Sequence, residues 1–145
     1  MGRVGYRDPS LEELTRRYGE HLQQAVGDTY VGLTAKWSVG DLLPGLSDLD
    51  FRVVLAGDAQ IDDWIAVDRA ASEIHGLLAG EKPSWWRYLE HTPGCGLSLT
   101  EVENADYHHP EYSCWHTCHG RDAAISAALH RADSRPWSAP VCRHG

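Results

Sequence analysis

The sequence predicts a domain of the α/β (α+β) class, in which a small mixed sheet is flanked by helices. Segments with helical spacing of apolar residues alternate with short segments rich in β-branched and aromatic residues. The chain has 145 residues, 42% of them hydrophobic, which is enough for one buried core. We therefore expect a single domain over residues 1–131 and an irregular tail over residues 132–145.

The first part of the chain is predicted to form one helix and then two strands. Apolar residues recur at helical intervals over 10–26, and Ser10 and Glu13 have the spacing of a capping box. Residues 29–37 and 48–55 are rich in β-branched or aromatic side chains and are bounded by turn residues, which favours strands. A turn-rich connection joins these two strands.

The remaining part is predicted to be mainly helical. Apolar residues lie on one helical face over 59–79, and the aromatic-rich segment 83–91 is a candidate short helix. Residues 94–103 alternate between apolar and polar side chains, which favours a strand. Pro110 suits the first turn of a further helix, and a second helical stretch follows over 121–131.

Charge and composition narrow the classes of function. The formal net charge is −8 with neutral histidines, so binding to a long nucleic acid would gain no help from counterion release. No run reaches the roughly 20 apolar residues that span a bilayer, and the N-terminus lacks the apolar segment of a signal peptide. We therefore expect a cytoplasmic protein whose four cysteines are reduced.

Two aspartates, Asp48 and Asp50, stand at the start of the apolar segment 48–55. Residues two apart in a strand project from the same face, so the two carboxylates would lie roughly 6–7 Å apart and repel each other. A divalent cation bound between them removes this repulsion, because carboxylate oxygens are the preferred ligands of Mg²⁺. The alternative is a solvated strand end, where water screens the two charges.

The segment SVGDLLPGLSDLDF, from Ser38 to Phe51, resembles the second part of the signature of the nucleotidyltransferase superfamily. This superfamily has the DNA polymerase β-like fold and includes the aminoglycoside adenylyltransferases. Its signature is a Gly-Ser pair at a strand end, a variable loop, and then Ser-Asp-hydrophobic-Asp-hydrophobic. The resemblance implies Mg²⁺-dependent transfer of a nucleoside monophosphate from a nucleoside triphosphate, such as ATP, to a hydroxyl acceptor, with release of pyrophosphate.

The resemblance also implies which residues bind the nucleotide phosphates. These are Lys36, Ser38, Gly40 and Ser47. Where the family has Gly-Ser, this chain has Ala35 and Lys36, or Trp37 and Ser38 if the loop is shorter by two. Lys36 could replace the serine contact with a point charge. The alternative is a catalytically inactive module of the same fold that binds a nucleotide or a partner without turnover.

The family's metal site needs a third carboxylate, because two aspartates supply too few ligands for metals that hold both reacting oxygens. We expect Glu101, from the next predicted strand, to join Asp48 and Asp50 as a catalytic and metal-binding residue. Glu103 lies on the same face of that strand and is the alternative. Glu101 or Glu111 could serve as the base, although the helix dipole also favours a glutamate in a first turn.

The acceptor is expected to be a small molecule or a protein. Members of the resembled family usually carry a helical region after the catalytic domain, which completes the acceptor pocket. A second copy of the chain or a partner subunit could supply this part, so an oligomer is one expectation.

A second cluster of potential ligands, HHPEYSCWHTCHG over 108–120, contains two cysteines and four histidines. Cys114 and Cys118 are four residues apart and would share one helix face, which favours packing in a core. Zinc is the alternative, with His91 and Cys95 as remote partners, although the spacing does not follow the usual pairs of zinc ligands.

Overall fold

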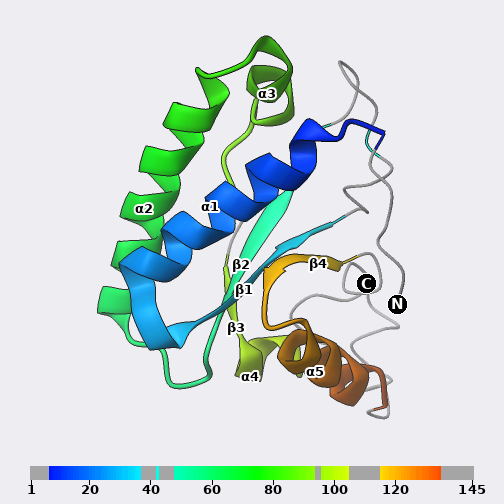
Figure 1. The fold of residues 1–145 in the computed structure, drawn as a ribbon. Helices are drawn as coiled ribbons and strands as arrows, with labels where there is room; N and C mark the ends of the chain where they lie inside the picture. Colours follow the sequence, from blue (N-terminus) through cyan, green and yellow to red (C-terminus); the bar gives the residue numbers. More distant parts are fainter. Residues whose placement is uncertain (1–6, 37–41, 43–47, 94–95, 105–114, 135–145) are drawn as a thin grey trace, which may run out of the picture.

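The computed structural model describes residues 7–36, 42, 48–93, 96–104 and 115–134, and it confirms the predicted class (Figure 1). The elements in chain order are α1 (Ser10–Val26), the 3₁₀ turn η1 (Gly27–Thr29), β1 (Tyr30–Ala35), β2 (Phe51–Leu55), α2 (Ile61–Ala79), α3 (Pro83–Tyr88), β3 (Leu97–Ser98), α4 (Leu99–Val102), β4 (His116–Gly120) and α5 (Asp122–Ser134). None of the described helices has the length and apolar character that crossing a membrane requires.

The four described strands form one mixed sheet in the order β3-β2-β1-β4. β1 is antiparallel to both of its neighbours, and Leu33 pairs with Val53 on one side and with His119 on the other. β2 is parallel to β3, so that Leu55 lies beside Ser98. The N-terminal end of β2 is therefore next to the end of β1, while β3 joins β2 near its opposite end.

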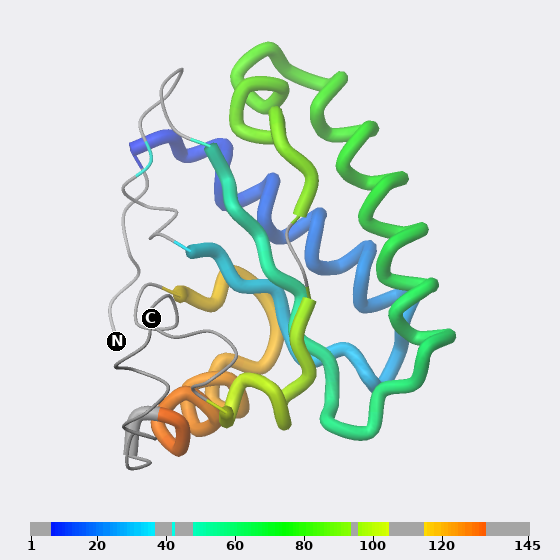
Figure 2. The backbone as a smooth tube through the Cα atoms, turned by 180° about the vertical axis from the view of Figure 1, so that it is seen from behind, coloured from blue at the N-terminus to red at the C-terminus, as the bar shows by residue number. Residues whose placement is uncertain are grey.

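Helices cover both faces of the sheet and create two cores (Figures 1 and 2). α1 and α2 pack side by side over one face. The larger core lies beneath them and includes Leu14, Tyr18, Leu33, Phe51, Val53 and Trp85. The smaller core lies on the other face, with α4 and α5, and consists of Val31, Val54, Val102, Trp115, Ile125 and Ala128. The alternation of side chains along β2 sends Val53 to the first core and Val54 to the second.

The predictions for the long helices are confirmed. α1 coincides with the predicted segment 10–26, and α2 and α3 lie within the segments 59–79 and 83–91. α5 begins at Asp122, at the start of the predicted stretch 121–131, but it ends at Ser134, three residues beyond the predicted end. The apolar periodicity of these segments is local information, which is why it could be read without the fold.

The predicted strand over 94–103 is wrong for most of its length. Of the residues described, only Leu97 and Ser98 belong to the sheet, and the chain turns into α4 at Leu99. The Ser98 hydroxyl accepts a hydrogen bond from the Glu101 backbone N–H at 3.2 Å, and the Glu101 carboxylate accepts one from the Ser98 N–H at 3.0 Å. This reciprocal pair is a capping box, and it starts the helix.

The helix predicted from Pro110 is also wrong where the structure describes it, because His116–Gly120 form β4. This strand pairs with the edge of β1 that β2 leaves open. The pairing satisfies backbone groups of β1 that would otherwise be buried without partners. Residues 105–114 lie outside the described residues.

Asp8, rather than the predicted pair Ser10 and Glu13, holds the start of α1. Its carboxylate accepts hydrogen bonds from the Ser10 backbone N–H (3.0 Å), the Ser10 hydroxyl (2.7 Å) and the Tyr88 hydroxyl (3.1 Å). Burial alone would raise the pKa of Asp8, but these hydrogen bonds and the charge of Lys82 lower it. Burial, together with the Asp8 contact, raises the pKa of Tyr88 to about 12.

The Asp8→Ala variant is expected to lower the free energy of unfolding by about 1 kcal/mol at pH 7, the usual net contribution of a side-chain hydrogen bond. Because folding lowers the Asp8 pKa below its ordinary 3.8, the contribution of the carboxylate is present above that pH and is lost as the pH falls through the folded-state pKa. The difference between wild type and variant should therefore shrink below about pH 4. Urea denaturation at neutral and at acidic pH measures this, and an equal difference at both would contradict it.

Candidate metal centre

The two aspartates lie immediately before β2, in an extended segment that the surrounding backbone holds in place. The Leu49 N–H donates to the Tyr88 carbonyl oxygen at 2.9 Å, and the Lys36 N–H donates to the Asp50 carbonyl oxygen at 3.0 Å. Leu49 is buried, whereas Asp48 is exposed and Asp50 is half-buried. The carboxylates thus alternate with the buried residue as predicted, although the regular strand begins only at Phe51.

The Asp50 carboxylate has a cationic partner on its own chain segment. It forms an ion pair with the Arg52 guanidinium, which also donates to the Phe51 carbonyl oxygen at 3.1 Å. Asp50 and Arg52 are two residues apart and project from the same side of the segment. Part of the repulsion between Asp50 and Asp48 is therefore offset without a metal.

Asp48 lies in a cluster with two residues that follow α3, Glu90 and His91. Their ligand atoms lie within 4.8 Å of one another, and all three side chains are exposed. The His91 Nε2 is 3.6 Å from an Asp48 carboxylate oxygen, and Glu90 accepts a hydrogen bond from Arg87 at 3.0 Å. Within the described part of the chain, these three residues are the ones whose ligand atoms lie close enough together to hold a metal ion.

The cluster forms because α3 ends beside the start of β2. The backbone hydrogen bond from Leu49 to Tyr88 places the residues after α3 alongside Asp48. Two carboxylates and one imidazole can ligate a divalent cation, with oxygen ligands suited to Mg²⁺ and the added nitrogen also suited to Mn²⁺. The donors present therefore fit a divalent metal ion, in a combination that differs from the predicted one.

Glu101 is not part of this cluster, which corrects the predicted set of Asp48, Asp50 and Glu101. β2 and β3 are parallel, so Glu101 follows the strand end that lies beside Leu55. The aspartates precede the other end of β2, and five strand residues at about 3.3 Å each separate the two places by roughly 16 Å. The Glu101 carboxylate instead caps α4.

Glu103, the alternative third carboxylate, is also engaged elsewhere. It pairs with Arg131 of α5, whose Nε donates to its carboxylate at 2.8 Å. This contact joins α4 to α5 on the face of the sheet that is opposite α1 and α2. Neither glutamate of the predicted strand therefore reaches the aspartates.

The predicted phosphate-binding residues fall largely outside the described residues. Lys36 follows the last residue of β1, next to Asp50, as its backbone hydrogen bond requires. Ser38, Gly40 and Ser47 lie in the part of the chain that is not described. The same is true of Glu111, the alternative base.

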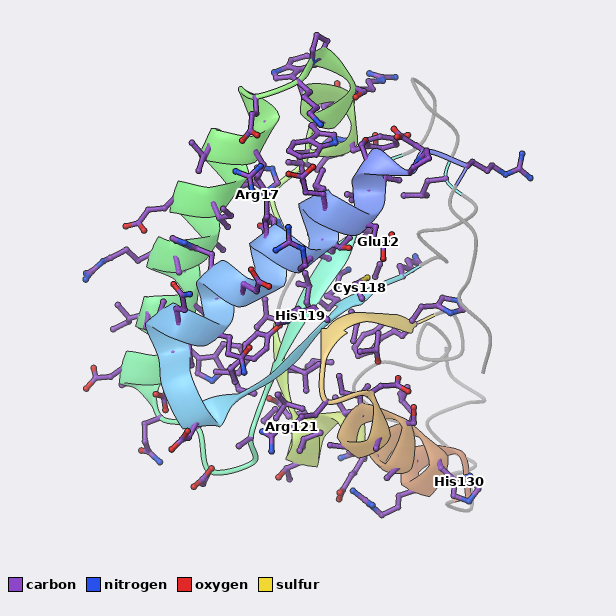
Figure 3. All side chains as sticks on the ribbon, viewed as in Figure 1. Glu12, Arg17, Cys118, His119, Arg121 and His130 are labelled. Carbon is purple, nitrogen blue, oxygen red and sulfur yellow. The ribbon has the colours of Figure 1, made fainter. Side chains whose placement is uncertain are left out.

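In the cysteine- and histidine-rich segment, the described residues Cys118 and His119 pack against the larger core beneath α1 (Figure 3). Burial raises the pKa of the Cys118 thiol to about 12, and this cysteine is free. The Tyr30 hydroxyl lies 2.8 Å from His119 Nδ1, and burial lowers the pKa of the imidazole. These two side chains thus have packing roles in β4, while Cys95 and Cys114 lie outside the described residues.

Sequence reasoning missed Glu90, and it considered His91 only as a remote partner in a zinc site with residues of the segment 108–120. The only local signal is an adjacent acid and imidazole after an aromatic-rich segment, in WWRYLEH. Their partner, Asp48, is about forty positions earlier, so no spacing rule links them. For Glu101 a local signal was available. Ser98 and Glu101 have the spacing of a capping box, which predicts that Glu101 caps a helix and does not bind a metal.

No protein-family model, curated protein or solved structure matches this chain significantly. The family resemblance therefore stays a prediction that depends on the sequence of the segment from Ser38 to Phe51.

Proposed function

We propose that this chain is a cytoplasmic, divalent-metal-dependent nucleotidyltransferase, which transfers a nucleoside monophosphate from a nucleoside triphosphate to the hydroxyl of a small-molecule or protein acceptor. The observation that carries the proposal is the position of Asp48 and Asp50. They stand where β2 begins and β1 ends, in a segment that resembles the family's Ser-Asp-hydrophobic-Asp-hydrophobic signature. Carboxylates at one edge of a sheet can hold a metal-bound triphosphate.

The metal ligands in this proposal are Asp48, Glu90 and His91, whose ligand atoms already lie together. A bound metal ion would neutralise phosphate charge while the acceptor oxygen bonds to the α-phosphorus and the bond to pyrophosphate breaks. Asp50 could bind the metal only if its carboxylate gave up the ion pair with Arg52. Lys36, which follows β1 at the same edge, is placed to contribute positive charge to phosphate binding.

A catalytically inactive binding module is the second candidate, and two observations favour it. The Asp50 carboxylate is paired with Arg52, and Glu101 lies at the other end of β2. A domain with fewer metal ligands could bind a nucleotide without holding both oxygens of an in-line displacement. The two candidates share nucleotide binding and differ in turnover.

A thermal-shift experiment tests nucleotide binding. Nucleoside triphosphate with Mg²⁺ or Mn²⁺, at about 100 times its dissociation constant, should raise the Tm of the wild type by about 5 °C or more. Asp48→Asn should abolish this increase, because it removes a charged ligand from the metal cluster. Glu90→Gln should do the same, since the proposal assigns this carboxylate to the metal rather than to Arg87 alone.

Glu101→Gln is the matched control, because it neutralises a carboxylate at the far end of β2. Its metal-dependent increase in Tm should equal that of the wild type, even if its own Tm is lower through the weakened cap. Loss of the increase in Glu101→Gln but not in Asp48→Asn would contradict the proposed site. Release of pyrophosphate with a panel of acceptors then separates the enzyme from the inactive module.

A further inference from the structure

A separate cavity of about 360 Å³ lies between α2 and β2. Figure 2 shows the described segment that follows α3 between these two elements. The residues that line the cavity are Val53, Trp64, Val67, Asp68, Ala71, Ser72, His75, Thr92, Pro93 and Gly96. None of the ligands of the candidate metal centre is among them, so the cavity is a second feature of the fold.

Part of the cavity lining is apolar. Val53, Val67 and Ala71 are buried, and they form this part of the lining together with the half-buried Trp64. The backbone at Gly96 lies against the Trp64 ring so closely that an added Cβ would overlap it. An added side chain at this position would have to displace the indole, so glycine lets the backbone approach the ring.

The polar side chains of the lining also come mainly from α2, between the apolar ones. Asp68 and Ser72 are four residues apart and so lie one turn from each other along the helix. Within the described residues, Asp68 makes no ion pair or hydrogen bond and its side chain is exposed. His75 does not serve as its partner, because its Nδ1 contacts the Tyr18 hydroxyl at 3.1 Å and its Nε2 contacts the Leu89 carbonyl oxygen at 2.7 Å.

We infer that this cavity binds a small organic cation, with its ammonium group at Asp68 and its apolar body against Trp64. An unpartnered carboxylate next to an aromatic ring is complementary to such a ligand, because both groups attract a cation. The volume lies at the lower end of the range for ligand pockets, which is about 300–1,000 Å³, so the ligand is of fragment size. The inference goes beyond the proposed nucleotidyl transfer and does not depend on it.

The net charge of −8 supports a cation over an anion. An anionic ligand of the same shape would be repelled by the Asp68 carboxylate and by the negative net charge of the protein. His75 is engaged elsewhere, because its two nitrogens contact the Tyr18 hydroxyl and the Leu89 carbonyl oxygen rather than Asp68. The charge of the ligand is thus the property that the cavity selects.

Calorimetric titration with three probes of one shape tests the inference. We expect phenethylamine to bind about fivefold more tightly than 2-phenylethanol, which corresponds to the upper end of the contribution of a solvent-exposed ion pair. Phenylacetate should not bind. Added salt should weaken the binding of the amine and leave that of the alcohol unchanged. The indole N–H resonance of Trp64 should shift on addition of the amine.

Asp68→Asn should remove the preference for the amine over the alcohol. Asp62→Asn is the matched control, because it neutralises another exposed carboxylate of α2 that does not line the cavity. Ser72→Tyr should block the cavity and abolish binding without disturbing the core, since Ser72 is exposed. The inference is overturned if the amine does not bind at millimolar concentration, if the alcohol binds equally well, or if the two asparagine variants behave alike.

Discussion

The Trp85→Ala variant is expected to lower the free energy of unfolding by about 3–5 kcal/mol, the usual cost of truncating a buried tryptophan. Trp85 is 0% exposed and is the largest of the fully buried side chains among the described residues. Its indole N–H donates to the Ser10 hydroxyl at 3.0 Å, and the Lys82 ammonium lies 4.3 Å from its ring centroid. The substitution therefore creates a cavity where α1, α2 and α3 meet.

This loss is large compared with the roughly 5–15 kcal/mol by which a typical domain is stable. Urea denaturation followed by far-UV circular dichroism measures it without relying on tryptophan fluorescence. Trp86→Ala is the matched control, because the neighbouring side chain is 58% exposed and its loss should change stability by only about 0.5 kcal/mol. Similar losses in the two variants would show that Trp85 does not anchor α3 in the core.

Gly120→Ala is expected to have the second large effect, because two separate costs add at this position. Gly120 has φ of 98°, a backbone conformation that costs other residues about 1–3 kcal/mol. An added Cβ would also lie 2.6 Å from the Gly32 Cα and would overlap the Val31 carbonyl oxygen. Both neighbours are backbone atoms of β1, so neither can move aside without disturbing the sheet.

Gly27→Ala separates these two costs. Gly27 also has a positive φ, of 80°, but an added Cβ there would meet nothing within 4 Å. We expect Gly120→Ala to lose about 1–3 kcal/mol more than Gly27→Ala, which is the usual cost of overpacking. Chemical denaturation of both variants gives the comparison, and equal losses would mean that the β4–β1 contact relaxes around the new methyl group.

The conformation of Gly120 matters because it joins β4 to α5. The next residue, Arg121, donates its backbone N–H to the Val31 carbonyl oxygen at 2.8 Å and its guanidinium to the Tyr30 carbonyl oxygen at 3.1 Å (Figure 3). These bonds fix the start of α5 against β1. The sequence marks Gly120 as an interruption between two helical stretches, whereas its actual role is to let the chain turn from a strand into a helix.

Local signals sufficed wherever a segment forms its structure from its own residues. The periodicity of their apolar side chains predicts α1 and α2. The apolar residues that follow Asp50 predict β2. The segment 94–103 had two local signals in conflict. Its alternation favours a strand, but the capping box of Ser98 and Glu101 favours a helix. Among the described residues, Leu97 and Ser98 pair with β2, and the capping box turns the chain into α4 from Leu99.

By itself the sequence determined the class of the fold, the main helices and the place of Asp48 and Asp50 at the start of β2. Only the tertiary structure decided which side chains stand beside them. It placed Glu90 and His91 next to Asp48, paired Asp50 with Arg52, and left Glu101 at the far end of β2. The physical reason is that periodicity and capping act within a few residues, whereas strand order and the packing of α3 against β2 depend on contacts between distant parts of the chain.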